Sequence, residues 1–133
     1  MPAALNSIEF IGNVHAGFPS PETGHKETPF DLNQYLQTSA DSVCLARVKG
    51  DSMINAQIPA DSIIIIDKSA QPRNNSIVVA SLAGEKVIKH IVKTHAGLFL
   101  ASNHPQHKPI LVLPEMDFAI CGVVTHVIVK LIK

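Results

Sequence analysis

Seven short runs rich in valine and isoleucine dominate the chain from residue 42 onward, and they constrain its fold more than any other feature. Glycine, proline, asparagine and aspartate separate these runs, as expected for strands joined by turns. One separator, residues 82–85 (Leu-Ala-Gly-Glu), is typical of a hairpin turn. The pattern predicts a mainly β domain, folded as a barrel-like or sandwich-like set of sheets. The predicted strands are residues 43–49, 62–67, 76–82, 86–93, 98–102, 110–113 and 118–132.

The first 29 residues differ from this pattern. Residues 17–24 are rich in proline and glycine, which favours an extended backbone over a packed element. Apolar residues at helical spacing follow Asp31, which is a suitable N-cap, so we expect a short helix there. We therefore predict an extended N-terminal arm over residues 1–29 and a β-rich domain over residues 30–133.

Composition excludes several classes of protein. The 133 residues suffice for one domain, and 11 basic against 11 acidic side chains leave no net charge to hold DNA directly. The chain has no Trp and one Tyr, too few aromatic rings for stacking on single-stranded bases. Its apolar runs are shorter than the ~20 residues of a membrane span. Cys44 and Cys121 cannot form a disulfide framework, so we expect a reduced, cytoplasmic protein without a membrane anchor.

One candidate nucleophile follows the first predicted strand. In the sequence Gly50-Asp51-Ser52-Met53, the aspartate would make a turn and Ser52 would open one helical turn that ends at residue 56. Unpaired backbone N–H groups at such a helix start could stabilise the oxyanion formed when the Ser52 hydroxyl attacks a carbonyl. The competing interpretation is that Ser52 only caps the turn, and this short motif alone favours it.

Lys89 is a candidate general base. It shares one face of the predicted strand 86–93 with Val87 and Ile91. An ammonium on an apolar face loses hydration, which lowers its pKa, and a neutral lysine can accept a proton from a serine hydroxyl. The competing interpretation is a lysine at the sheet edge whose stem packs while its charged end reaches water, and periodicity alone favours that.

Seven histidines raise the question of a metal site. His104 and His107 flank Pro-Gln in a turn, and neither Cys44 nor Cys121 has a CxxC partner. This pattern lacks the three or four ligands in register that zinc requires, so we predict no metal and no other cofactor. We expect the two cysteines to be core residues, because a thiol in apolar surroundings ionises poorly.

Taken together, several segments resemble the LexA/UmuD-type self-cleaving serine peptidases, and most of all their UmuD branch. The spacing also fits this family, with 36 positions from Ala16 to Ser52 and 37 from Ser52 to Lys89. The resemblance covers most of the chain. The segments that carry it are Gly17-Phe18-Pro19-Ser20-Pro21, Asp31-Leu32-Asn33-Gln34, Gly50-Asp51-Ser52-Met53-Ile54 and Gly122-Val123-Val124-Thr125-His126-Val127.

The resemblance implies a LexA/signal-peptidase-like β-rich catalytic domain with an extended N-terminal arm. It implies that Ser52 is the nucleophile, that Lys89 is the general base, and that the bond between Ala16 and Gly17 is cleaved. Lys86 is a fallback base, although it lies on the other face of its strand and breaks the family spacing. We expect the arm to enter the site by strand addition along a sheet edge.

The resemblance also implies a biological setting. Only sixteen residues precede the expected cleavage site, too few for a helix-turn-helix domain, so we expect no sequence-specific DNA binding. A UmuD-like protein would act in the SOS response: a RecA–single-stranded DNA filament would stimulate the cut, and the trimmed form would support a UmuC-type translesion polymerase. We expect a homodimer, with residues 118–132 forming part of its interface. The alternative is a non-catalytic β-rich dimerisation module related to repressor C-terminal domains.

Overall fold

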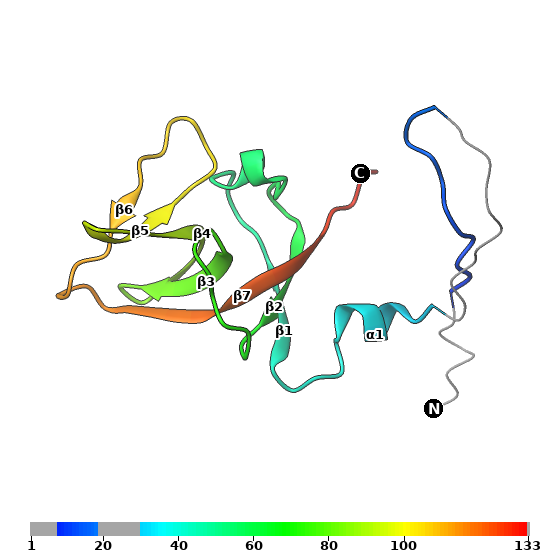
Figure 1. The fold of residues 1–133 in the computed structure, drawn as a ribbon, viewed down its shortest axis with the longest axis horizontal. Helices are drawn as coiled ribbons and strands as arrows, with labels where there is room; N and C mark the ends of the chain where they lie inside the picture. The colour runs from blue at the N-terminus through cyan, green and yellow to red at the C-terminus, as the bar shows by residue number, and fades with distance from the viewer. Residues whose placement is uncertain (1–7, 19–29, 133) are drawn as a thin grey trace. The chain divides into compact units, whose positions relative to one another are not determined.

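The computed structural model of the chain describes residues 8–18 and 30–132 (Figure 1). The chain divides into two compact units, Met1–Ser39 and Ala40–Lys133, and each is considered by itself. Within the described residues, no helix combines the length and the apolar character needed to cross a membrane.

The first unit contains the helix α1 (Leu32–Leu36). The carboxylate of Asp31 accepts hydrogen bonds from the backbone N–H groups of Asn33 (3.0 Å) and Gln34 (3.3 Å). These two bonds satisfy donors that have no partner inside the helix, so Asp31 is an N-cap as its position predicts.

An aromatic cluster joins the start of the described chain to α1. The rings of Phe10 and Phe30 are stacked with their centroids 4.6 Å apart, and Tyr35 lies 5.3 Å from Phe30. Residues 8–18 contain neither helix nor strand. The other parts of the predicted arm, residues 1–7 and 19–29, lie outside the described residues.

The second unit is a sheet in which every pair of neighbouring strands is antiparallel. Its spatial order, β1-β2-β7-β3-β4-β5-β6, places the last strand of the chain in the middle. Each predicted strand is present with boundaries shifted by a few residues, so the prediction of a mainly β fold is confirmed. The strands are β1 (Val43–Arg47), β2 (Ile63–Asp67), β3 (Ile77–Leu82), β4 (Glu85–Thr94), β5 (Gly97–Ala101), β6 (Ile110–Leu111) and β7 (Phe118–Ile128).

The predicted hairpin turn joins β3 to β4. Leu82 pairs with Glu85, and the two residues between them have positive φ, 52° at Ala83 and 83° at Gly84. Two-residue hairpin turns of this kind need positive φ at both central positions, which glycine adopts without strain. This tight turn fixes the register of β4 and therefore the direction in which its lysines point.

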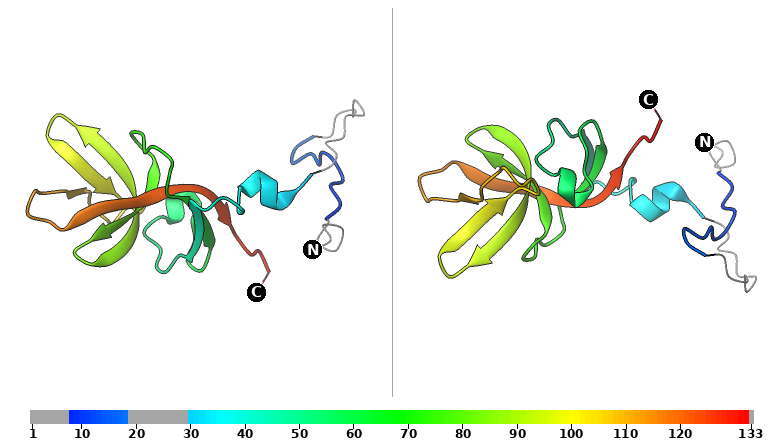
Figure 2. Two further views of the ribbon diagram at one scale, coloured as in Figure 1. Left: turned by 90° about the horizontal axis from the view of Figure 1, so that it is seen from below. Right: turned by 90° about the horizontal axis from the view of Figure 1, so that it is seen from above.

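Strand β7 connects two lobes of the sheet. Its first half pairs with β3 and its second half with β2, and Val123 has a partner in both strands (Figures 1 and 2). One buried cluster, which includes Met53 and Ile66, packs against β1 and β2 and extends to Val79 of β3. A second cluster, centred on Ile91 and Leu100, fills the lobe of β3 to β6.

Gly122 allows the two lobes to meet. A Cβ atom at this position would lie 2.6 Å from the Ile66 Cγ2 atom and 3.0 Å from the Asp67 backbone oxygen. No side chain fits at such distances, so β7 can approach β2 this closely only with a glycine.

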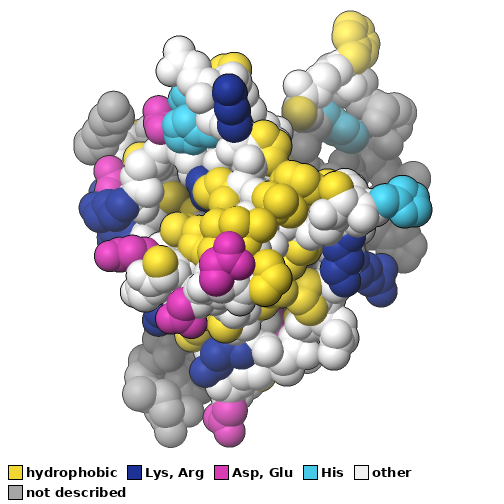
Figure 3. Space-filling view, turned by 90° about the vertical axis from the view of Figure 1, so that its left-hand side faces the viewer, with side chains coloured by type: hydrophobic (Ala, Val, Ile, Leu, Met, Phe, Trp, Pro, Cys, Tyr) yellow, Lys and Arg dark blue, Asp and Glu magenta, His cyan; other side chains and the backbone are white. Residues whose placement is uncertain are grey.

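Hydrophobic side chains also reach the surface at the end of the second lobe, beside β5 and β6 (Figure 3). The half-buried hydrophobic residues that pack against the second cluster are Leu82, Val87, Leu98, Ile110, Val112, Phe118 and Val123.

Within the part of the chain that the structure describes, the sheet has outer strands β1 and β6, and part of β4 also lacks a partner on one side. Strand β1 is the first strand of the sheet and pairs only with β2. Strand β4 pairs with β5 only from His90 onward, so residues 85–89 have a neighbour, β3, on one side only. Unpaired strand edges expose backbone donors and acceptors that an added strand can use.

Candidate active site

The turn that follows β1 presents Ser52. Gly50 has a φ of 86°, a left-handed conformation that bends the chain away from the strand. Met53 is only 1% exposed and anchors the turn in the first buried cluster, while Ser52 remains half-buried beside it. The buried methionine therefore holds the neighbouring hydroxyl in a defined place.

The helical turn after Ser52 is a short 3-10 helix, η2 (Ile54–Ala56). Its N-cap is Met53, and no side chain caps it, so the interpretation of Ser52 as a mere cap is wrong. No described residue accepts a hydrogen bond from the backbone N–H of Ser52 or of Met53. These two donors are free to bind another acceptor close to the Ser52 hydroxyl.

Lys89 extends from β4 to this hydroxyl. Its Nζ atom lies 3.2 Å from Ser52 Oγ, and its cross-strand neighbour in β3 is the fully buried Val78. Burial lowers the pKa of Lys89 below the ordinary value of 10.5, because the charged form loses hydration. No acidic side chain among the described residues pairs with it. The two residues selected from the sequence thus meet, with the amine shifted toward its neutral form.

A third residue, Ser102, completes this arrangement and was not foreseen. Its Oγ atom lies 2.7 Å from Lys89 Nζ, closer than Ser52 does. The register of β4 and β5 pairs His90 with Ala101, which puts Ser102 beside Lys89 one step further along. A tight turn at residues 94–97 is the signal in the sequence that could have identified Ser102. This turn sets the register between β4 and β5, and the register determines which residue lies opposite Lys89.

The loop after β5 is attached to the turn that carries Ser52. The backbone N–H of Asn55 donates to the Asn103 carbonyl oxygen at 2.9 Å. His104 Nε2 lies 3.5 Å from an Asp51 carboxylate oxygen. Asp51 and Asn55 lie on either side of Ser52, and Asn103 and His104 directly follow Ser102, so these contacts hold the two hydroxyls near the same lysine.

Asp51, His104 and His107 place potential ligand atoms within 4.8 Å of one another. The two imidazole rings are stacked with centroids 4.3 Å apart. However, His104 Nδ1 accepts a hydrogen bond from the Gln106 backbone N–H at 3.2 Å. A neutral ring in this arrangement carries its proton on Nε2, the atom that faces Asp51, and a protonated nitrogen has no lone pair for a metal. The contact therefore favours an Asp–His pair over a metal site.

A groove runs between the two unpaired strand edges and ends at the dyad. Its volume is about 550 Å³. Consecutive residues line both sides, residues 44–49 along β1 and residues 86–89 along β4, so the walls are formed by the strand edges themselves. Lys86 and Lys89 both line this space, but Lys89 is the one bonded to Ser52. The unpaired backbone groups on both walls are of the kind that bind an extended peptide by strand addition.

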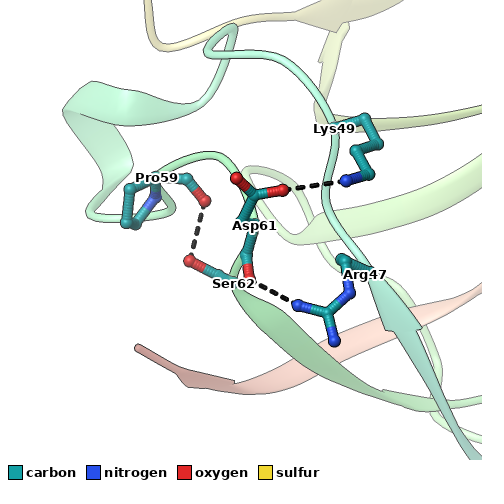
Figure 4. Close-up of polar contacts among 5 residues, drawn as sticks. All are labelled: Arg47, Lys49, Pro59, Asp61 and Ser62. Carbon is teal, nitrogen blue, oxygen red and sulfur yellow. Dashed lines mark hydrogen bonds and ion pairs between the residues drawn. The ribbon is translucent and has the colours of Figure 1, made fainter. Parts of the chain in front are cut away.

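The wall formed by β1 is braced by the loop before β2 (Figure 4). Lys49 Nζ forms an ion pair with the Asp61 carboxylate at 2.9 Å, and Arg47 donates to the Asp61 carbonyl oxygen at 3.1 Å. The Ser62 hydroxyl donates to the Pro59 carbonyl oxygen at 2.7 Å and stabilises the same loop. The hydrogen bond from the Lys49 ammonium, with its positive charge, also lowers the pKa of Asp61.

The expected cleavage site belongs to the first unit. Ala16 and Gly17 are both exposed there, and the flanking side chains of Val14 and Phe18 are 80% and 96% exposed. The bond and the side chains of Val14 and Phe18 are therefore accessible among the described residues of this unit.

Comparison with known proteins identifies the family. A model of the "Peptidase S24-like" family matches residues 9–125, which is most of the chain. The chain belongs to this family. The resemblance to LexA/UmuD-type peptidases and the β-rich fold expected from it are thereby confirmed.

Individual relatives of this S24 chain support the assignment. It is 32% identical over 120 residues to Protein ImpA of Salmonella typhimurium and, equally, to Protein ImpA of Escherichia coli, covering 90% of this chain and 81% of those proteins. It is 34% identical over 125 residues to LexA repressor 1 of Xanthomonas campestris, covering 92% of this chain but only 60% of the repressor. The similarity to the repressor is thus confined to part of that protein.

Proposed function

We propose that this S24 peptidase cleaves its own chain between Ala16 and Gly17, with Ser52 as nucleophile and Lys89 as general base. The observation that supports this most directly is the 3.2 Å contact between Lys89 Nζ and Ser52 Oγ in a groove lined by two strand edges. Burial of the lysine adds to it, since a neutral amine is the form that can accept a proton.

The proposed reaction proceeds in two steps. Neutral Lys89 accepts the hydroxyl proton as Ser52 Oγ attacks the Ala16 carbonyl carbon, and the backbone N–H groups of Ser52 and Met53 stabilise the resulting oxyanion. The C–N bond then breaks, and the Gly17 amine leaves with the proton from the Lys89 ammonium. Water, activated by the same amine, hydrolyses the ester between Ser52 and Ala16 and restores the enzyme.

We infer that the arm binds as a strand in the groove. The backbone of β1 and of residues 85–89 is unpaired on that side, so an extended segment can form hydrogen bonds with either edge. Val14, Ala16 and Phe18 alternate along the chain and would share one face of such a strand. Because the arm is covalently attached, the reaction needs no diffusive encounter with a separate substrate.

We further propose a role in the SOS response, like that of UmuD. A RecA–single-stranded DNA filament would favour the engaged arm, and the trimmed chain would support a UmuC-type translesion polymerase in the cytoplasm. The similarity to ImpA proteins and LexA repressors supports this setting.

We also propose a homodimer that uses the end of β7 and the residues after it. Hydrophobic side chains there are exposed, with Ile128 at 47%, Val129 at 40% and Leu131 at 90%. Apolar side chains at such exposures are stabilised when a second subunit covers them.

The test is the release of residues 1–16 from the purified full-length chain. Incubation at mildly alkaline pH, and separately with a RecA filament, should yield a new N-terminus at Gly17, detected by mass spectrometry. Ser52→Ala and Lys89→Ala should remain intact under both conditions. A wild-type chain that stays whole under both conditions would contradict the proposal and favour a non-catalytic dimerisation module.

A further inference from the structure

The groove beside Ser52 is lined by cations and by no acidic side chain. The basic residues in its lining are Arg47, Lys49, Lys68, Lys86 and Lys89. Lys89 is the candidate base, and the charge of Lys49 is balanced by Asp61. Among the described residues, no ion-pair partner exists for the remaining three, and Lys68 and Lys86 are exposed. A segment that enters the groove therefore meets a positive potential.

The charges of the chain cancel overall, but they are distributed unequally between its two units. Residues 1–39 contain four acidic and one basic side chain, which gives a net charge of −3. Residues 40–133 contain seven acidic and ten basic side chains, which gives +3. The unit with the expected cleavage site and the unit with the groove thus carry opposite charges.

We propose that Lys68 binds the carboxylate of Glu9 and thereby docks the arm with Ala16 at Ser52. This inference rests on the proposed self-cleavage and names the charges that select its substrate segment. Glu9 is exposed in the first unit, so its carboxylate is accessible to such a partner.

The chain lengths agree with this assignment. Glu9 precedes Ala16 by seven residues, which span about 23 Å in an extended strand. Lys68 lies at the far end of the groove from Ser52, because its backbone N–H donates to the Ser42 carbonyl oxygen at 2.8 Å. Ser42 precedes Lys49 by seven residues, again about 23 Å along β1 and the residues that follow it. An arm segment that ends at Ser52 thus places Glu9 near Lys68.

The mechanism explains why the N-terminal side of the cleavage site should be held. After the peptide bond breaks, residues 1–16 remain attached to Ser52 through an ester until water releases them. An ion pair at position 9 keeps this piece aligned during both steps, whereas contacts beyond Gly17 act only before the first cut.

Charge reversal in the full-length chain tests the proposal. At low salt, Glu9→Lys and Lys68→Glu should each slow self-cleavage about three- to tenfold, because an exposed attraction becomes a repulsion. The double variant Glu9→Lys/Lys68→Glu should recover most of the wild-type rate. Lys93→Glu is the matched control: it makes the same charge change on β4, outside the groove, and should leave the rate unchanged.

The wild-type rate should also fall as salt is raised from 0.05 to 0.5 M in such an assay, since salt screens exposed charges. Single variants that cleave at the wild-type rate, or a double variant slower than both, would overturn the charge pairing while self-cleavage itself stands. Slowing by Glu22→Lys but not by Glu9→Lys would overturn the assignment to Glu9.

Binding in trans separates this proposal from catalysis. A fluorescein-labelled peptide of residues 7–18 is titrated into full-length Ser52→Ala chain and followed by fluorescence anisotropy. The peptide with Glu9→Lys should bind about three- to tenfold more weakly, and addition of Lys68→Glu to the protein should reverse that order. A chain that never cleaves would refute the proposed function, yet equal binding of both peptides would still refute the charge pairing by itself.

Discussion

Removal of the Ser102 hydroxyl tests how the candidate base is held. Ser102 Oγ lies 2.7 Å from Lys89 Nζ, while Ser52 Oγ lies 3.2 Å away, so Ser102 provides the shorter of the two contacts. Accepting an amine N–H, Ser102 turns the lone pair of neutral Lys89 toward Ser52. Without that acceptor the amine can rotate, and the geometry for proton transfer is adopted less often.

The expected magnitude follows from this hydrogen bond. Its loss is worth about 1–2 kcal/mol, which corresponds to a roughly 5- to 30-fold lower plateau rate of self-cleavage for Ser102→Ala. The same bond stabilises the ammonium more than the neutral amine, because charged donors bind more strongly. Its removal should therefore lower the pKa of Lys89 further and move the pH–rate profile toward lower pH.

The assay follows release of residues 1–16 from purified chain between pH 7 and 11. Ser102→Thr, which keeps the hydroxyl, should retain a profile close to that of wild type. Ser81→Ala on β3 serves as the control for loss of a serine elsewhere in the sheet. An unchanged plateau for Ser102→Ala, or a profile moved to higher pH, would show that Ser102 does not position the lysine.

Three further substitutions test other parts of the structure. Gly122→Ala forces a Cβ atom to 2.6 Å from a side-chain methyl of β2, so it should lower the unfolding free energy by about 1–3 kcal/mol; an unchanged melting temperature would contradict this. Lys89→Met should abolish cleavage and remove a pH dependence of stability. Because burial lowers the folded-state pKa of Lys89, the unfolding free energy of wild type should increase as pH rises toward 10.5. If urea unfolding gives wild type and Lys89→Met the same dependence of this free energy on pH, the prediction is refuted. Gly17→Glu should block cleavage on a gel, since its side chain obstructs approach of the bond to Ser52; normal cutting would mean that the cleavage site lies elsewhere.

Local signals in the sequence predicted the elements of the fold well. Strand-like runs, the two-residue turn at Ala83 and Gly84, and the cap at Asp31 all depend on neighbouring residues. The order of the strands in the sheet, by contrast, does not depend on neighbouring residues. Strand β7 lies between β2 and β3 because of pairings such as Ile64 with Val127, which are far apart in the sequence and leave no local pattern.

In the candidate site, too, some residues could be predicted from the sequence, whereas others depend on contacts that form only in the folded chain. The dyad was inferred from a serine motif, an apolar strand face and family spacing, whereas Ser102 depends on how β4 and β5 pair. The contact between Asp51 and His104 depends on two loops that meet only in the folded chain. The groove itself exists because β5 stops short of residues 85–89, and strand lengths were predicted only to within a few residues.

The unpaired edges of β1 and of residues 85–89 also affect solution behaviour. Exposed backbone along a strand can recruit the same strand of another copy, which is how sheet proteins begin to aggregate. Charged side chains such as Arg47 and Lys86 oppose this by repelling a second copy, but they do not remove the open hydrogen-bonding groups. A segment that fills the groove would therefore cover these strand edges and protect the sheet from aggregation. Its departure would expose the edges to other copies of the chain.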